Sequence, residues 1–224
     1  SIEMFEAFGF SEEVLREGYK VNEVSFWRPD AHNNSLSRAD RIQDVEDDLS
    51  EMPHVILNQA RVHDFYLEMM RIASRRVTPD YDRELDSLTV SEDANDADFP
   101  VRASFKSLSA ENTTETIRAR YVVGCDGARS VVRKSLGHSL KGESARQLWG
   151  VMDVLAVTDF PDIRLKAAIQ SADQGSILII PREGGYMVRM YIELDELAEG
   201  ERASDRRVTA EMLVAKAGAI LAPY

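Results

Sequence analysis

The chain has 224 residues, of which 44% are hydrophobic and 29% are charged, as in ordinary globular proteins. Its 27 Lys and Arg residues against 39 Asp and Glu residues give a formal net charge of −12, which makes nucleic acid and anionic membranes poor partners. The single cysteine excludes an internal disulfide and a cysteine-based metal site. No apolar stretch approaches the ~20 residues that span a bilayer and no signal peptide is recognised, so a cytoplasmic location is the default expectation.

The first part of the chain predicts helical segments followed by strands. Apolar residues among residues 2–15 recur at the spacing of an amphipathic helix or a broken pair of helices, which Gly9 interrupts. Partial alternation over residues 19–27 predicts a strand, and residues 36–45 a returning strand. The acidic residues of 44–51 predict a solvated loop.

Residues 53–74 predict an amphipathic helix whose start is marked by Asn58 as a plausible N-cap. Its apolar residues recur every three or four positions, so that face is expected to belong to the core. The expected inward residues are Val62, Phe65, Tyr66, Met69 and Ala73.

Three strands that form an antiparallel meander are predicted next, over residues 84–90, 101–108 and 116–121. The connections, residues 91–99 and 109–114, are typical of hairpin loops. We assign no chemistry to the meander itself.

The most informative stretch follows the meander. An apolar run over residues 121–123 ends at Gly124-Cys125-Asp126-Gly127, and a helix is expected from Ser130 to Gly137. A strand, a tight turn and a helix place ligands at the carboxyl end of a parallel strand in α/β proteins. Gly127 allows close backbone approach, Asp126 can accept hydrogen bonds from sugar hydroxyls, and the helix would direct free N–H groups at an anion. The alternative is a buried strand that ends in a glycine turn, with Asp126 as a helix cap. On either interpretation Cys125, at the end of an apolar run, is expected to be a small buried residue and not a nucleophile.

The last part of the chain predicts a sheet and a helix. After a polar link at residues 140–147, four strand-like runs are separated by short turns, which favours antiparallel pairing. Trp27 and Trp149 are expected in the core, and residues 193–207 form a charged loop. The predicted strands are residues 148–157, 165–170, 176–181 and 186–194, and the predicted helix is residues 208–221, with Met212, Ala215, Ala219 and Ile220 facing inward.

The segment Val123–Arg133 resembles the Asp-Gly fingerprint of single-component flavoprotein aromatic hydroxylases, and the phenol 2-monooxygenases and 3-hydroxybenzoate hydroxylases are the most similar members. In that family the motif contacts FAD and is implicated in NAD(P)H binding. The resemblance therefore implies cofactor-binding roles for Asp126, Gly127, Arg129 and Ser130.

Two further segments resemble the same family. Residues 56–62 are similar to the segment in which a glutamine side chain reaches the flavin, which implies Gln59 as a cofactor contact and Arg61 as a nearby cation. Residues 179–191 are similar to the hairpin that brings arginine and tyrosine to the flavin and the substrate. Arg189 and Tyr191 have the same parity on one strand and so point to one face.

The resemblance implies roles for that hairpin. Tyr191 is expected to contact the phenol group of the substrate and to assist its deprotonation, and Arg189 to lie on the flavin side, where a cation stabilises reduced anionic flavin. Arg182, near the turn, is the third candidate catalytic residue. The alternative is a surface hairpin with an arginine whose stem is buried and a tyrosine at an interface. The four histidines, His32, His54, His63 and His138, lack metal-ligand spacing and are expected at the surface, so no metal site is predicted.

The implied fold class is α/β (α+β). A partial glutathione-reductase-type FAD-binding fold with an antiparallel meander would be joined to a mainly antiparallel substrate-domain sheet with helices. The expected parts are a helical segment at 1–18, strands at 19–45 that join the substrate domain, a partial FAD-binding domain at 53–144, and the substrate domain at 145–224.

The implied function is that of an FAD- and NAD(P)H-dependent monooxygenase that hydroxylates a small phenolic substrate, and the resemblance also implies a homodimer, since many family members are dimers. The Gly-x-Gly-x-x-Gly turn and the later Gly-Asp segment of the family are absent from these residues, so we expect an internal piece that is inactive alone and holds no flavin at micromolar FAD. The alternatives are a non-catalytic binding or assembly module on this scaffold, or another flavin enzyme of the same fold, a halogenase or a reductase.

Overall fold

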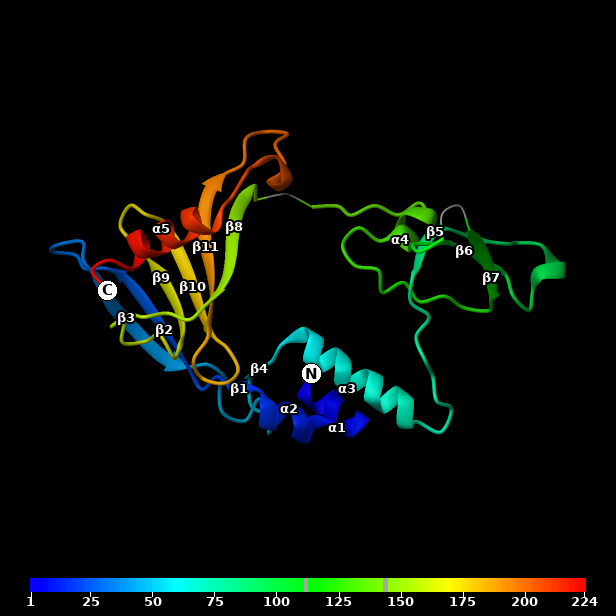
Figure 1. Cartoon of the computed structure of the whole chain (residues 1–224), viewed down its shortest axis with the longest axis horizontal. Coiled ribbons are helices and arrows are strands. Elements are labelled where there is room, and N and C mark those ends of the chain that lie inside the picture. Colours follow the sequence, from blue (N-terminus) through cyan, green and yellow to red (C-terminus); the bar gives the residue numbers. More distant parts are fainter. Residues whose placement is uncertain (111–112, 143–144) are drawn as a thin grey trace. The chain divides into compact units, whose positions relative to one another are not determined.

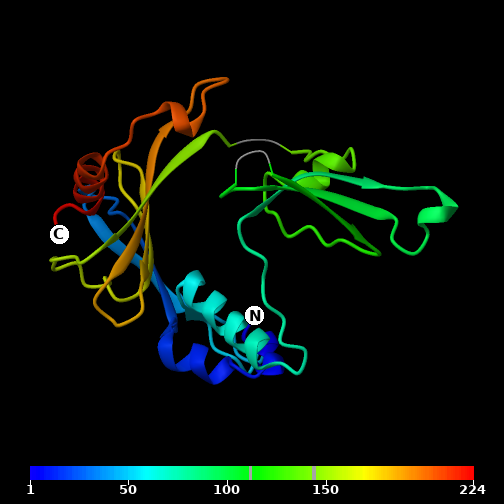
Figure 2. The ribbon, with the colours of Figure 1, turned by 45° about the vertical axis from the view of Figure 1, so that its right-hand side comes forward.

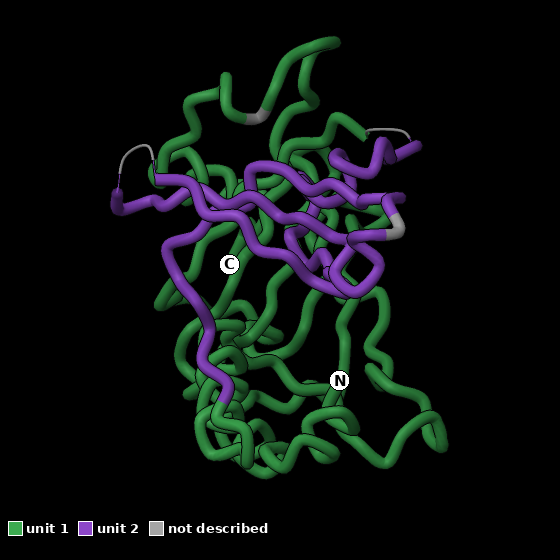
Figure 3. The backbone as a smooth tube through the Cα atoms, turned by 90° about the vertical axis from the view of Figure 1, so that its right-hand side faces the viewer, with its two compact units in different colours: residues 1–76, 145–224 green, residues 77–144 purple. Residues whose placement is uncertain are grey.

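The computed structural model describes residues 1–110, 113–142 and 145–224. The chain divides into two compact units, residues 1–76 with 145–224 and residues 77–144 (Figure 3). Residues 111 and 112 of the predicted hairpin loop, and 143 and 144 of the predicted link, lie outside the described residues. The predicted FAD-binding part, which starts at residue 53, therefore does not coincide with a compact unit.

Three helices pack together in the first unit: α1 (Ile2–Phe8), α2 (Ser11–Glu17) and α3 (Gln59–Ile72). Gly9 ends α1 with a φ of 83°, which a glycine adopts without strain. The Asn58 side chain accepts a hydrogen bond from the Ala60 N–H at 2.9 Å, so the predicted cap is confirmed. Phe10 and Phe65 are buried between these helices, where their ring centroids lie 5.8 Å apart. The short strands β1 (Tyr19–Lys20) and β4 (Val55–Ile56) pair beside the helices.

A six-stranded sheet is the largest other part of this unit (Figure 1). Each neighbouring pair is antiparallel except β2 and β9, which run parallel. The predicted mainly antiparallel sheet is therefore confirmed, and strands from residues 19–45 do join it. In spatial order the strands are β3 (Leu36–Gln43), β2 (Glu23–Pro29), β9 (Lys166–Gln170), β10 (Ser176–Pro181), β11 (Val188–Glu196) and β8 (Gln147–Val154).

Helix α5 (Ala210–Leu221) packs on one face of the sheet (Figure 2). The Thr209 side chain caps it by accepting a hydrogen bond from the Met212 N–H. Of the predicted inward residues Ile220 is buried, as expected, but the prediction is wrong for Met212, Ala215 and Ala219, which are exposed. Apolar residues surround most of this helix, so its sequence periodicity does not single out one face. The residues that pack on the sheet are Leu213, Ala217, Ile220 and Leu221.

The core between α5 and the sheet contains one buried carboxylate, Asp162. It accepts a hydrogen bond from the Trp27 indole at 2.8 Å and a bidentate pair from Arg38 at 2.8 and 2.5 Å. Burial alone would raise the pKa of Asp162, but the hydrogen bonds from Arg38 and Trp27 outweigh it and hold the pKa below its ordinary value. The indole also packs on Phe160, which is 1% exposed.

The opposite face of the sheet, which we call the open face, carries the alternate residues of each strand. Its central row follows from the strand register and consists of Phe26, Ala168, Leu178, Tyr191 and Val151. Trp149 lies on this face and is 44% exposed, so its predicted place in the core is wrong. The cause is its parity on β8, because Gly150 takes the inward position against Leu213.

The second unit contains the predicted antiparallel meander, β5 (Arg83–Val90), β6 (Val101–Ser107) and β7 (Thr114–Ala119). Helix α4 (Val131–Ser135) packs against β5. Short 3₁₀ turns lie at Ala94–Asp96 in this unit and at Ala203–Asp205 in the first unit.

The predicted strand at residues 121–123 is not formed within the part of the chain that the structure describes. Tyr121 and Val123 are 83% and 84% exposed, and no strand pairs with this run. A strand is stable only with a hydrogen-bonded neighbour, and β7 ends at Ala119 before the run begins. The prediction that Cys125 is buried is wrong for the same reason, since it is exposed.

We predict that Asp162→Asn lowers the free energy of unfolding by about 2–3 kcal/mol near neutral pH, because it weakens the bonds to a guanidinium and an indole that are packed against it. The folded-state pKa of Asp162 is depressed, so its contribution exists above the ordinary value of 3.8 and is lost as the pH falls through the folded-state pKa. Urea denaturation at neutral and acidic pH measures both effects. Asp173→Asn, at an exposed turn, is the matched control and should change little.

Candidate functional site

The Asp126 carboxylate is hydrogen-bonded to the start of α4. It accepts from the Ser130 hydroxyl at 2.6 Å and from the backbone N–H groups of Val131 and Val132 at 2.6 and 3.1 Å. The Ser130 hydroxyl in turn accepts from the Arg133 N–H at 3.0 Å. Ser130 and these backbone N–H groups together hold the pKa of Asp126 below its ordinary value.

The anion site that we expected at this helix start is therefore filled by the chain's own carboxylate. Asp126 has the geometry of the alternative interpretation, a helix cap, while its outer lone pairs stay exposed to solvent. Arg129 is exposed and has no acidic partner among the described residues. The cofactor roles of Asp126, Gly127, Arg129 and Ser130 stay predictions.

The two glycines of this corner have different physical roles. Gly127 has a φ of 72°, a left-handed conformation that favours glycine, and a Cβ there would meet no atom within 4 Å. Gly124 makes the close approach instead, because a Cβ there would lie 2.9 Å from Cβ of Val132 in α4. The backbone therefore comes close to helix α4 at Gly124, and not at Gly127 where the close approach was expected.

Gln59 and Arg61 lie in the first turn of α3. The Gln59 side chain is exposed, and no described residue bonds to its amide. The Arg61 guanidinium donates to Glu17 of α2 at 2.6 and 2.8 Å and lies 4.4 Å from the centroid of the Phe65 ring. The hydrogen bonds that Arg61 donates to the Glu17 carboxylate raise the pKa of Arg61. Arg61 therefore ties two helices together, and Gln59 is the uncommitted side chain of the pair.

Arg189 and Tyr191 share the open face, as their parity predicts. Arg189 lies opposite Asp153 of β8 and donates to it at 2.8 Å through both Nε and Nη2. The hydrogen bonds to Asp153 raise the pKa of Arg189, and a hydrogen bond with Tyr191 raises it further. The same pair lowers the pKa of Asp153. Tyr191 is half-buried between Leu178 and Val151, its register partners on the neighbouring strands.

Arg182 follows β10 directly, and its side chain belongs to the same face by alternation. It is 8% exposed and donates to the adjacent Glu183 at 2.9 and 3.2 Å. The charge of Arg182 contributes to the lowered pKa of Asp153. The structure thus brings all three candidate catalytic residues to one sheet face, and each of the two arginines has a carboxylate partner.

Asp44, which directly follows β3, is a buried charged group that the sequence analysis did not single out. The Asp44 side chain is 5% exposed, accepts a hydrogen bond from Lys166 Nζ at 2.9 Å and is hydrogen-bonded to His54 Nδ1. Burial alone would raise the pKa of Asp44, but its bonds to His54 and Lys166 outweigh that effect and lower it. Asp44 is therefore not part of a solvated acidic face. It lies in a run of similar acidic residues, so no local signal distinguishes it.

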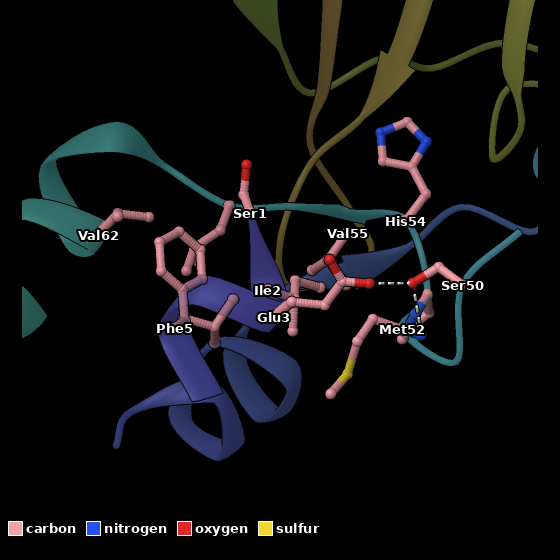
Figure 4. Close-up of a pocket in the computed structure, with 12 residues that line it drawn as sticks. Ser1, Ile2, Glu3, Phe5, Ser50, Met52, His54, Val55 and Val62 are labelled. Atoms are coloured by element: carbon pink, nitrogen blue, oxygen red, sulfur yellow. Dashed lines mark hydrogen bonds between the residues drawn. The ribbon is translucent and has the colours of Figure 1, made fainter. Parts of the chain in front are cut away.

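A pocket of about 370 Å³ lies beside α1 and the segment that leads to β4 (Figure 4). Ile2, Phe5 and other apolar side chains line it, and Ser50 donates to Glu3 at 2.8 Å across it. The imidazole of His54 points away from Ile2 and Phe5 (Figure 4). None of the predicted site residues lines this pocket, and we give it no function.

The family described as the FAD binding domain matches residues 1–223 of the chain. The chain belongs to the FAD-binding monooxygenase family. It is 54% identical over its full length to a 3-hydroxybenzoate 4-monooxygenase of Comamonas testosteroni and 43% identical to an FAD-dependent monooxygenase of Aspergillus terreus. The chain spans 35% and 36% of the lengths of these two relatives.

Solved structures share the fold of this family member. A p-nitrophenol 4-monooxygenase of Pseudomonas putida DLL-E4 superposes with a TM-score of 0.71 over 98% of this chain and 50% of its own, at 13% identity. A flavin-dependent monooxygenase solved with FAD and substrate gives a TM-score of 0.66 over 97% of this chain and 37% of its own, at 16% identity. These likenesses establish the α/β fold alone.

The described residues form neither a cluster of metal ligands nor a membrane-spanning helix. Over residues 1–110, 113–142 and 145–224 no three His, Cys, Asp or Glu side chains gather as metal ligands would. No helix within the same residues has the length and apolar character needed to cross a membrane.

We predict that Gly124→Ala destabilises the second unit by about 1–3 kcal/mol, because the new methyl group would overlap Val132 and α4 would have to move. Urea denaturation measures the loss. Gly218→Ala in α5 is the matched control, because its Cβ meets nothing within 4 Å, and it should stabilise by about 0.5–1 kcal/mol. Equal effects of the two substitutions would contradict the close packing at Gly124.

We predict that Asp126→Ala speeds amide hydrogen exchange at Val131 and Val132 by about tenfold, because both N–H groups lose their acceptor. NMR exchange rates on the intact chain test this. Asp98→Ala, at an exposed position in the same unit, should leave both rates unchanged. Unchanged rates in Asp126→Ala would show that the carboxylate does not hold the helix start.

Proposed function

We propose that this chain is the central part of an FAD- and NAD(P)H-dependent monooxygenase that hydroxylates a small phenolic substrate. The observation that supports this proposal is that Arg189 and Tyr191 lie on the same face of the sheet, in a chain that belongs to the FAD-binding monooxygenase family. Relatives over the whole chain include the 3-hydroxybenzoate 4-monooxygenase and, at 31% identity, a phenol 2-monooxygenase of Aspergillus fumigatus. Both names describe enzymes that act on a hydroxylated ring.

The residues present fit parts of an FAD molecule. The exposed Gln59 amide offers a donor and an acceptor for polar groups of the cofactor, and Arg129 offers a cation without an acidic partner among the described residues. Arg61 fits less well, because binding a phosphate would require it to leave Glu17 or to share its guanidinium. When bound, FAD would carry the reducing equivalents of NAD(P)H to oxygen and so supply the oxygen activation.

The chain's own groups position and polarise the substrate. The Tyr191 hydroxyl can accept a hydrogen bond from the phenol hydroxyl of the substrate while it donates its own proton onward toward solvent, and loss of the phenol proton through this relay makes the ring more electron-rich. Arg189 places a cation on the same face as Tyr191, and Asp153 fixes the orientation of the Arg189 guanidinium through two hydrogen bonds. Arg182, paired with Glu183 and almost fully buried, stabilises the end of the same hairpin.

A second candidate function is a non-catalytic assembly module. The exposed side chains of Tyr121 and Val123 favour it, because contiguous exposed apolar groups mark association surfaces. Sedimentation of the chain tests this function. Self-association that is lost in Tyr121→Ser and in Val123→Ser would support it. A monomeric chain would count against it.

The proposed function predicts that this chain can replace its counterpart in the Comamonas enzyme. We expect a chimera in which the matching 227 residues are exchanged for this chain to retain FAD and to couple NAD(P)H oxidation to hydroxylation of 3-hydroxybenzoate. Within it, Tyr191→Phe should lower kcat/KM by about 100-fold with unchanged FAD content, because the hydroxyl that relays the phenol proton is lost.

Tyr186→Phe is the matched control, since Tyr186 is 62% exposed at the turn of the same hairpin and should leave kcat/KM unchanged. Product analysis separates hydroxylation from uncoupled NAD(P)H oxidation. A chimera that binds FAD but forms no hydroxylated product, or equal losses in the two tyrosine variants, would refute the assignment of Tyr191.

A further inference from the structure

The hairpin of β10 and β11 ends in a turn, residues 182–187, that has little support of its own. Gly184 and Gly185 lie exposed at its tip, with φ values of 81° and 75°. Two backbone hydrogen bonds lie inside the turn as the structure describes it, from the Arg182 N–H to the Met187 carbonyl at 2.9 Å and from the Gly185 N–H to the Arg182 carbonyl at 3.4 Å. Because glycine has no side chain that could pack on the sheet, the turn depends on contacts from outside for a fixed position.

An arginine from another segment supplies such contacts. Arg164 lies in residues 155–165, which connect β8 to β9. Its guanidinium donates from Nη2 to the Tyr186 carbonyl at 2.9 Å and from Nη1 to the Met187 carbonyl at 3.3 Å. The Met187 carbonyl therefore accepts from both Arg164 and the Arg182 N–H. Hydrogen bonds from a charged donor are stronger than neutral ones, so one side chain contributes much of the support of the turn.

The backbone that carries Arg164 is itself held from two sides. Asp162, two residues earlier, is 2% exposed and accepts hydrogen bonds from Trp27 and Arg38. The Tyr19 hydroxyl of β1 donates to the Arg164 carbonyl at 2.7 Å. Figure 1 shows the turn of the hairpin at the end of the sheet next to β1. Since a support must be fixed before it can fix anything else, these bonds allow Arg164 to set the position of the turn.

We propose that Arg164 is a positioning residue, whose two bonds fix the turn that joins Arg182 to the strand of Arg189 and Tyr191. A displaced Met187 carbonyl would move Arg182 directly, through the hydrogen bond that closes the turn, and would move the start of β11 with it. Arg164 thus acts through the backbone of the hairpin. Its effect on catalysis rests on the proposed function, whereas its effect on the turn is a property of this chain and needs no flavin.

Amide hydrogen exchange in the 224-residue chain tests the hold on the turn. We expect Arg164→Gln to speed exchange of the Arg182 N–H by about tenfold, because the turn loses a charged donor and opens more often. The Ile179 N–H, in the middle of β10, should keep its rate. The NMR signal of Arg182 Nε–H, which donates to Glu183, should shift as the turn relaxes. Arg75→Gln, at an exposed position of the same unit, is the matched control and should change none of these signals.

The chimera described above tests the catalytic consequence. Arg164→Gln should raise KM for 3-hydroxybenzoate by about tenfold and lower the yield of hydroxylated product per NAD(P)H oxidised, because Arg189 and Tyr191 are held less precisely. FAD content should stay unchanged, which separates this effect from a general loss of stability. Arg164→Lys should recover part of the yield, since its ammonium group can still donate to one of the two carbonyls.

Unchanged exchange of the Arg182 N–H in Arg164→Gln would overturn the proposal. So would exchange that becomes faster at Arg182 and Ile179 alike, because Arg164 would then stabilise the whole unit and not the turn. An Arg164→Gln chimera with unchanged KM and full product yield would also overturn it. A parent chimera that forms no hydroxylated product would refute the proposed function instead, and the exchange rates in the chain alone would still decide whether Arg164 fixes the turn.

Discussion

Strand alternation divides the side chains of the six-stranded sheet into two sets, and helix α5 covers only one of them. The inward set is almost wholly apolar and packs on Leu213 and Ile220, which stabilises the unit. The outward set is thereby free to carry polar and charged groups, including Arg189 and Tyr191, without disturbing the core. The candidate site therefore depends on the one-sided packing of this sheet.

Carboxylates set the charge of the open face. Asp153 pairs with Arg189, and Asp44 pairs with Lys166, so two cations that could bind any anion are already satisfied. Pairing also fixes the orientation of each cation, which a site for a defined substrate requires. Arg28 of β2 differs, because none of the described carboxylates pairs with its guanidinium.

The corner around Asp126 shows how one residue can meet two requirements. Its carboxylate satisfies the N–H groups at the start of α4, which would otherwise stay unpaired. The same bonds hold the pKa of the carboxylate low, so it stays charged and can still accept bonds on its outer side. Gly124 lets the chain pass close to Val132, and Gly127 provides the left-handed turn. Structural capping and cofactor contact are thus compatible at Asp126.

The sequence by itself determined the family, the strands of the meander and the sheet, and the shared face of Arg189 and Tyr191, because these follow from local motifs and the two-residue period of strands. It misplaced Trp149 and the inward face of α5, where apolar residues occur on more than one side. It also predicted a strand at residues 121–123, for which the described chain offers no pairing partner. Only the tertiary structure decided that the Asp44 side chain is buried, because its burial depends on Lys166, 122 residues away in the chain, which meets it together with His54 only on folding.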